Sequence, residues 1–153
     1  MVDSAAQDCK DVIQLDARTF LESVEKADAI IANKLIEKQQ WHDLALSITA
    51  NMEGERVHST GAKDKMASAV ERCLDMEAEI DRAVAKLVKV KPNVTEVIEQ
   101  LYSPMEYNVL HMRYIQYKSL QEIEDKYHKS DGWAKVTCKR ATSHVQAILN
   151  KTK

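Results

Sequence analysis

Eight apolar residues between Met66 and Val90 recur in strictly alternating steps of three and four along the chain. They are Met66, Ala69, Cys73, Met76, Ile80, Ala83, Leu87 and Val90. A mean step of 3.5 residues keeps one apolar seam of an α-helix turned toward a neighbouring helix. The seam mixes small residues with methionines, which permits close and adaptable packing. The pattern therefore predicts a long helix that packs against a partner helix.

A second apolar stripe precedes this seam and predicts the partner. Its members are mostly three or four residues apart, and they are Phe20, Val24, Ala27, Ile31, Leu35, Trp41, Ala45 and Ile48. Lys38 interrupts the stripe, which predicts a helix from about Lys10 to Ala50 with a break or bend near Trp41. Residues 51–64 contain two of the three glycines and show no period, so we predict a loop there.

The simplest arrangement of these segments is a long antiparallel, coiled-coil-like helical hairpin. The same seam could instead pair two chains, and a dimer could use both kinds of contact. Composition favours helices throughout, because three glycines and two prolines in 153 residues leave few helix breaks and few β-turns. We therefore predict an all-α fold.

Pro92 should end or kink the seam helix, because proline lacks the backbone N–H and clashes with the preceding turn. Val94, Val97, Ile98 and Leu101 then predict one more short amphipathic helix. We accordingly divide the chain into residues 1–92, a hairpin for oligomerisation or partner binding, and residues 93–153, a C-terminal domain.

Three helix-start signals lie in this C-terminal domain. Ser103 and Ser119 are each followed three residues later by a glutamate, which is the pattern of a capping box, and Ser130 or Asp131 can cap a third helix that ends near residue 149. A tight turn at His128-Lys129 separates the second helix from the third. Three short helices in this order outline a helix-turn-helix, which places one helix in the DNA major groove.

The third helix has two predicted faces. Its inner face carries Ala134, Thr137, Ala141, Val145 and Ile148 at three- and four-residue steps. Its outer face could meet base edges or phosphates. The predicted DNA-binding residues of this helix and the preceding turn are Lys129, Ser130, Lys135, Val136, Lys139 and Arg140. We expect Lys129 and Arg140 to hold phosphates. A three-helix packing unit that makes no DNA contact is the alternative.

The net charge of −2 hides an uneven distribution. Residues 1–102 contain 13 Lys and Arg against 19 Asp and Glu, a net charge of −6, whereas residues 103–153 contain 9 against 5, a net charge of +4. An acidic helical segment joined to a basic C-terminal domain suits a nucleic-acid contact at the basic end. A surplus of this size is also ordinary for a stretch of fifty residues.

The remaining motifs exclude several classes of protein. Cys9, Cys73 and Cys138 are too widely spaced for a disulfide framework or a zinc site, and the five histidines do not cluster. The chain has no phosphate-binding glycine loop, dinucleotide-binding motif or nucleophile elbow. We therefore expect no enzyme activity, no cofactor and no metal. The chain lacks a long apolar stretch and an apolar signal region, so we expect a cytoplasmic protein without membrane contact.

One loop segment could have a binding role. Glu55 to Lys63 contains side-chain and backbone donors that could hold a phosphate or a partner carboxylate. The simpler interpretation is a hairpin loop ordered by its own capping hydrogen bonds.

Residues 105–145 resemble the promoter-recognising C-terminal domain of primary-type sigma factors, known as region 4. The matching parts keep the family's spacing, and they are Met112-Arg113-Tyr114, residues 118–123, Ser130, Lys135 and Lys139-Arg140-Ala141. Ala134 and Thr137 stand where larger aliphatic residues are usual, and residues 131–133 stand where DNA-contacting residues are usual. The resemblance implies a helix-turn-helix fold, but a preference for minus-35-type sequences does not carry over.

Residues 44–87 are similar to a family of small proteins of Gram-positive phages and prophages that have sigma-like C-terminal ends. The similar segments are Ser47-Ile48-Thr49, residues 56–59, residues 63–66 and residues 74–77. The similarity implies a phage or prophage origin. Together with the predicted helix-turn-helix, it leads us to expect a DNA-binding transcriptional regulator that acts on double-stranded DNA at promoters, alone or with RNA polymerase. The helical hairpin predicts a homo-oligomer such as a dimer. The alternatives are a phage DNA-packaging recognition subunit that assembles into a ring, and a protein-interaction module without DNA binding.

Overall fold

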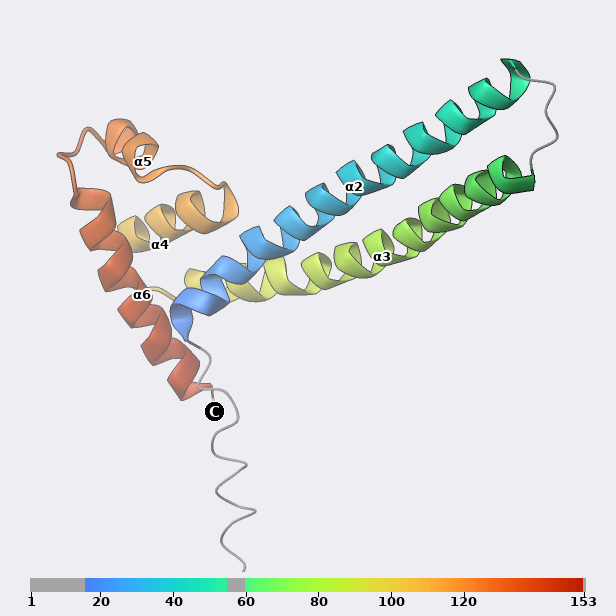
Figure 1. Ribbon diagram of the computed structural model, residues 1–153. Coiled ribbons are helices and arrows are strands. Elements are labelled where there is room, and N and C mark those ends of the chain that lie inside the picture. Colours follow the sequence, from blue (N-terminus) through green and yellow to red (C-terminus); the bar gives the residue numbers. More distant parts are fainter. Residues whose placement is uncertain (1–15, 55–59, 153) are drawn as a thin grey trace, which may run out of the picture. The chain divides into compact units, whose positions relative to one another are not determined.

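The computed structural model describes residues 16–54 and 60–152, and within these ranges the chain forms helices and no strands (Figure 1). The five α-helices are α2 (Ala17–Gly54), α3 (Thr60–Glu99), α4 (Pro104–Leu110), α5 (Leu120–Tyr127) and α6 (Trp133–Lys151). A π-helical segment, η1 (His111–Ile115), continues α4. The all-α prediction is thus confirmed for these residues. None of their helices combines the length and the apolar character needed to cross a membrane.

Contacts group the chain into two compact units. One unit consists of residues 26–89, which form most of α2 and α3. The other joins the described start of α2 to residues 90–152, which include the end of α3 and all later helices. The division of the chain into two domains at residue 92 stays a prediction. It does not account for the start of α2, which packs with the C-terminal residues.

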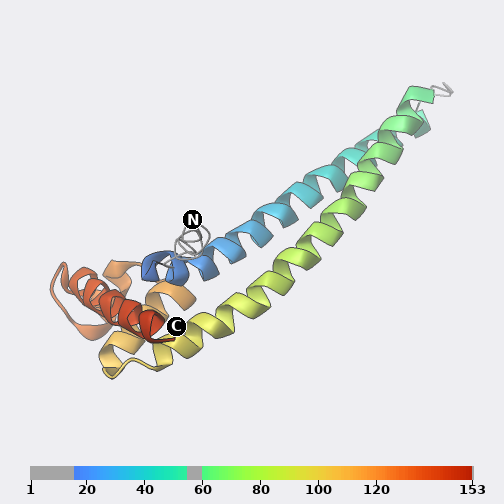
Figure 2. The same ribbon diagram turned by 90° about the horizontal axis from the view of Figure 1, so that it is seen from below.

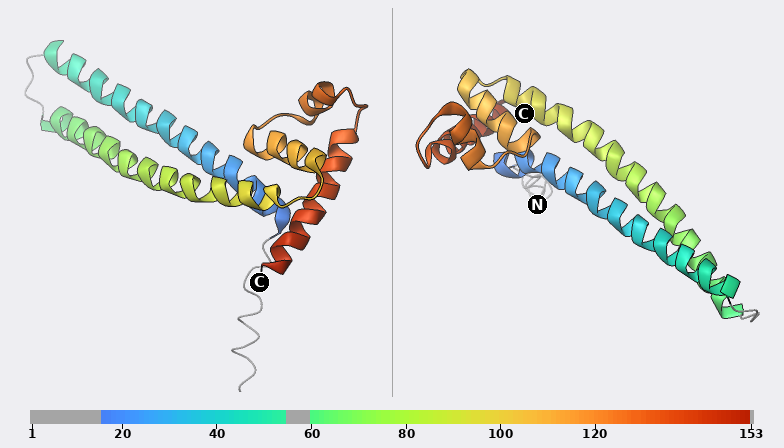
Figure 3. Two further views of the ribbon diagram at one scale, coloured as in Figure 1. Left: turned by 180° about the vertical axis from the view of Figure 1, so that it is seen from behind. Right: turned by 90° about the horizontal axis from the view of Figure 1, so that it is seen from above.

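Within residues 26–89, α2 and α3 lie side by side and run in opposite directions (Figures 2 and 3). Lys34 contacts Glu79 near one end of the pair, and Thr49 contacts Met66 near the other, so residue numbers fall along α3 as they rise along α2. The seam predicted on α3 is partly shielded from solvent: Ala69 and Met76 are buried, and its other residues from Met66 to Leu87 are half-buried.

The face that α2 turns toward α3 differs from the predicted stripe. Leu35 was expected on it but is 50% exposed, whereas Lys34 and Lys38 are half-buried there. These two lysines lie at the positions where the three- and four-residue spacing between Ile31 and Trp41 would place apolar residues. They hold these positions because each reaches a carboxylate on α3.

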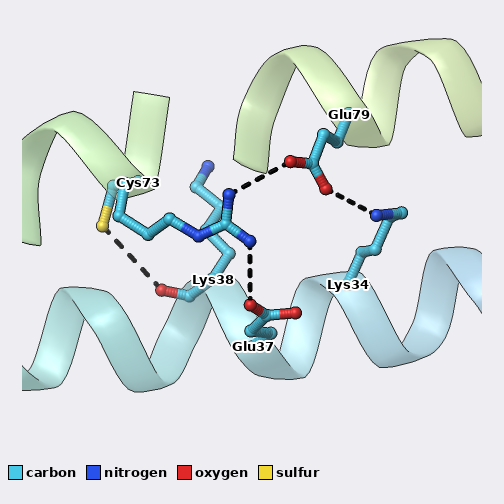
Figure 4. A network of polar contacts seen from close by, with 6 residues as sticks. Lys34, Glu37, Lys38, Cys73 and Glu79 are labelled. Carbon is cyan, nitrogen blue, oxygen red and sulfur yellow. Dashed lines mark hydrogen bonds and ion pairs between the residues drawn. The ribbon is translucent and has the colours of Figure 1, made fainter. Parts of the chain in front are cut away.

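Four ion pairs form this charged layer between α2 and α3, and those of Lys34 and Arg72 with Glu37 and Glu79 are drawn in Figure 4. The N–O distances are 2.6 Å for Lys34–Glu79, 2.7 Å for Lys38–Glu77, and 3.1 Å for both Arg72–Glu37 and Arg72–Glu79. The pKa of Glu79 lies below its ordinary value because Lys34 and then Arg72 donate hydrogen bonds to it. Partly exposed pairs of this kind add little stability, but they disfavour other registers of the two helices.

Both ends of the predicted loop at residues 51–64 are helical. α2 continues past Trp41 without interruption and reaches Gly54, and α3 already begins at Thr60. The expected break near Trp41 is therefore wrong, because a helix with a continuous packed face has no cause to end there. Residues 55–59, which include most of the proposed phosphate-holding loop, lie outside the described residues, as do the first 15 residues.

α3 also passes through Pro92 and ends only at Glu99, so the predicted separate helix at residues 94–101 is wrong. Pro92 itself is exposed, whereas Val94 and Ile98 are fully buried just beyond it. Burial of these two side chains offsets the hydrogen bond that proline removes, and the helix continues.

The unit that contains the C-terminus is built around one apolar core. α4 and α5 both pack on α6, and α5 also contacts η1. Fully buried side chains come from five helices, and they are Leu21, Val24, Val94, Ile98, Val109, Leu110, Ile123, Ala141 and Val145. The backbone N–H of Ala17 also donates a hydrogen bond to Gln146 Oε1 at 2.8 Å. The start of α2 is therefore part of this core.

Candidate nucleic-acid interface

α5 begins at a complete capping box, as predicted. Ser119 Oγ accepts a hydrogen bond from the backbone N–H of Glu122 at 3.1 Å, and Glu122 Oε2 accepts one from the backbone N–H of Ser119 at 2.7 Å. The pKa of Glu122 lies below its ordinary value mainly because its carboxylate accepts this backbone hydrogen bond. The box satisfies two backbone donors and thereby defines where α5 starts.

The capping box predicted at Ser103 is only half formed. Ser103 Oγ accepts a hydrogen bond from the backbone N–H of Glu106 at 3.4 Å, and Pro104 occupies the first turn of α4. The Glu106 carboxylate is turned toward α6 instead of back toward Ser103. There it lies 2.9 Å from Arg140 Nε and 2.7 Å from His144 Nδ1.

Glu106 is a buried link between α4 and α6, with only 4% of its surface exposed. Burial alone would raise the pKa of its carboxyl, but the hydrogen bonds from His144 and Arg140 outweigh this effect and hold the pKa below its ordinary value. Arg140, which we expected to hold a phosphate, thus has a partner inside the protein. Its side chain is still 58% exposed, so its phosphate contact stays a prediction.

α6 begins without the cap predicted from Ser130 or Asp131. The helix starts at Trp133, and Gly132 at the N-cap position has a φ of 85°, a left-handed conformation that favours glycine. A carboxylate from α5 supplies the missing acceptor: Glu124 Oε1 accepts a hydrogen bond from the backbone N–H of Ala134 at 3.0 Å. This contact ties the start of α6 to α5.

Glu124 is absent from the predicted site, although only 4% of its surface is exposed. One sequence signal was available. Glu124 follows Ile123 on a helix of eight residues, so a carboxylate there lies close to the buried face. A buried carboxylate requires a hydrogen-bond donor, and the unpaired backbone N–H groups of a following helix are the nearest source.

The tight turn predicted at His128-Lys129 follows α5. His128 has a left-handed φ of 52°, and the backbone N–H of Lys129 returns to the carbonyl of Glu124 at 3.0 Å. Lys129 Nζ lies 5.7 Å from the ring centroid of Trp133, within the range of a cation–π contact. The turn therefore presents the positive charge of Lys129 beside the start of α6.

The two faces of α6 are as predicted. Ala134, Thr137, Ala141 and Val145 are buried, and Ile148 is half-buried. On the opposite side the exposed residues include Lys135, Val136 and Lys139, with Val136 64% exposed.

Lys135 and Lys139 are four residues apart, so they are neighbours on the same helix surface. Neither forms an ion pair with another residue in the described part of the chain. The structure thus brings three of the six predicted residues onto one exposed surface, which we call the α6 outer face: Lys135, Val136 and Lys139.

Lys129 and Ser130 lie in the turn that precedes α6, and both are exposed. The carbonyl of Ser130 accepts a hydrogen bond from the backbone N–H of Trp133 at 3.2 Å, which is a role within the turn. Which of the six residues contact a partner stays a prediction. Within residues 16–54 and 60–152, no three His, Cys, Asp or Glu side chains are grouped so that they could hold a metal ion.

Comparisons with protein-family models, with curated proteins and with solved structures found no match to this chain. The resemblances to sigma region 4 and to the phage protein family are therefore expectations from the sequence.

Proposed function

We propose that this chain is a DNA-binding transcriptional regulator of phage type, in which α5, the turn and α6 act as a helix-turn-helix. The observation that carries this proposal is the α6 outer face. It presents an exposed valine and two lysines that form no ion pair within residues 16–54 and 60–152, on a helix whose other face is buried. The surplus of positive charge in residues 103–153 also favours a DNA contact at this end of the chain.

The chemistry of the α6 outer face suits a major groove. A groove about 12 Å wide admits one helix, and lysine can donate to guanine or to phosphate oxygens. Val136 lies between Lys135 and Lys139 in the sequence and offers the apolar contact that a thymine methyl group accepts. The contacts of Glu124 and Glu106 hold α6 against α5 and α4, so little ordering of α6 would be needed on binding.

The paired helices α2 and α3 have a separate role in this proposal. We propose that they form the helical hairpin expected from the sequence and provide a surface for self-association or for RNA polymerase. The protein would act in the cytoplasm. The mass of the particle in solution separates regulation from packaging, because a dimer or monomer fits a regulator and a ring of many subunits fits a packaging component.

Replacing Lys135 and Lys139 together by alanine tests the DNA contact. Binding of promoter-length duplex DNA, followed by fluorescence anisotropy at several salt concentrations, should weaken at least about tenfold, since lost base and phosphate contacts each reduce affinity. The matched control is Lys65→Ala with Lys86→Ala, which removes the same charge from two exposed positions of α3. Undiminished DNA binding by the variant with Lys135→Ala and Lys139→Ala would refute the role of α6 in the DNA contact. If the wild-type protein binds RNA polymerase but has no affinity for DNA, the chain is a protein-interaction module instead.

A further inference from the structure

α3 carries a second apolar stripe beside its seam, and this stripe is exposed. Four of its large side chains are 43%, 61%, 41% and 65% exposed, and they are Val70, Leu74, Val84 and Val88. Ala67 is exposed at one end of the same stripe. Each of the five residues follows a seam residue by one position, so the stripe repeats the three- and four-residue steps of the seam. We call these five residues the outer stripe.

The spacing of the outer stripe restricts what can cover it. It extends over 21 residue steps, or about 32 Å of helix at 1.5 Å per residue. Apolar residues with a 3.5-residue period over this length can pack along another long helix whose apolar residues have the same period. The two acidic positions within it are Glu77 and Asp81, and Glu77 is already paired with Lys38 at 2.7 Å.

Charged side chains flank the outer stripe on the side away from the seam, and their signs are segregated. Glu71 and Asp75 lie beside its first half, whereas Arg82 and Lys89 lie beside its second half. All four are exposed, and none forms an ion pair with another residue in the described ranges. A partner helix that runs antiparallel and carries the same sequence would place each acidic pair against a basic pair.

We propose that the outer stripe is the contact surface for a second copy of this chain, with the two α3 helices antiparallel across a two-fold axis. In one register of this pairing, Val70 faces the partner's Val88 and Leu74 faces the partner's Val84. This register also places Glu77 opposite the partner's Asp81, where the Lys38 ammonium 2.7 Å from Glu77 offsets part of the negative charge. The same register brings Asp75 close to the partner's Arg82. A two-fold contact is self-complementary, so one set of residues supplies both sides of the interface.

The inference deepens the self-association proposed above and is independent of DNA binding. It also differs from the contact predicted from the sequence, which used the seam that α2 covers. A parallel pairing would place Glu71 and Asp75 against their own copies, and these like charges would repel each other.

The first experiment tests the apolar contact. Sedimentation velocity of the full chain without DNA should show a dimer that Leu74→Glu with Val88→Glu converts to monomer, with helical content unchanged because both side chains are exposed. The matched control is Ile36→Glu with Leu46→Glu, on α2, where the side chains are 59% and 57% exposed. A wild-type monomer at all concentrations, or equal dimerisation of both variants, would overturn the proposal and leave DNA binding to be judged separately.

The second experiment tests the direction of the helices. Glu71→Lys with Asp75→Lys should raise the dissociation constant of the dimer at least about tenfold, because both ends of the contact then carry like charges. Adding Arg82→Glu and Lys89→Glu in the same chain should restore it. Glu96→Lys with Glu99→Lys makes the same net charge change on α3 away from the outer stripe and serves as the control. An unchanged constant in the first variant, or no restoration in the fourfold variant, would exclude the antiparallel pairing.

Discussion

Glu124 is the residue on which the start of α6 depends most directly. Replacing it by alanine leaves the backbone N–H of Ala134 without its acceptor in a buried position, which should destabilise the fold by about 1–3 kcal/mol. Urea unfolding followed by circular dichroism measures this change. Gln121→Ala, on the exposed side of the same helix, is the control and should have a small effect. If both variants unfold at the same urea concentration, Glu124 does not hold α6 in place.

Glu106 makes the stability of the C-terminal unit depend on pH. Its pKa is lower in the folded chain than in the unfolded chain, so the folded state gains stability above the ordinary value of 4.5 and loses it as the pH falls through the lowered value. Glu106→Gln removes this contribution. The difference in unfolding free energy between wild type and Glu106→Gln should therefore be large at pH 7 and shrink in acid. A difference that is constant from pH 7 to pH 3 would contradict the role of this carboxylate.

Side chains whose function is local could be predicted from the sequence, and side chains with distant partners could not. The Ser119 box uses residues three positions apart, and the outer position of Lys135 follows from helical period alone. Glu106 looked like half of a local cap, yet its partners are 34 and 38 residues away. Lys38 looked like a break in a stripe because Glu77, which pairs with it, is 39 residues away.

At the level of elements, the ends of the long helices were the least predictable feature. A proline or a glycine marks a place where a helix can stop, but buried side chains on both sides decide whether it does. Val94 and Ile98 lie within six residues after Pro92 and are fully buried, so α3 continues. Periodicity alone was enough to identify the seam of α3. Every seam residue up to Leu87 is at least partly shielded from solvent, as the period predicts.

Because α3 continues through Pro92, this proline lies in a helix interior and should lower the stability of the fold. Proline in a helix interior is up to about 3 kcal/mol less favourable than alanine. Pro92 is exposed, so Pro92→Ala removes no buried contact and should raise the midpoint of thermal unfolding. Asn93→Ala, at the neighbouring exposed position, provides the comparison for a change that restores no backbone donor. A lower midpoint in Pro92→Ala would show that the proline is needed for the conformation of α3.

At the level of the whole molecule, the order of segments along the chain does not coincide with the order of packing. Apolar period predicted Val24 correctly as a buried helix residue, but period does not say which helices a side chain meets. Leu21 and Val24 are fully buried in the unit that contains α4, α5 and α6. A division at residue 92 instead assigns Leu21 and Val24 to the N-terminal domain, because they are close in sequence to the rest of α2.

Leu21→Ala distinguishes these two divisions of the chain. If the start of α2 completes the core of the C-terminal unit, the variant should lose about 2–5 kcal/mol of stability, as expected for a leucine truncated in a core. Hydrogen exchange should then accelerate in α4, α5 and α6 more than in the part of α3 between residues 60 and 89. Leu46→Ala, at a side chain 57% exposed on α2, should leave exchange in α4 to α6 unchanged. Faster exchange confined to residues 26–89 in the Leu21 variant would instead support a boundary at residue 92, with α4 to α6 folding independently of the first helix.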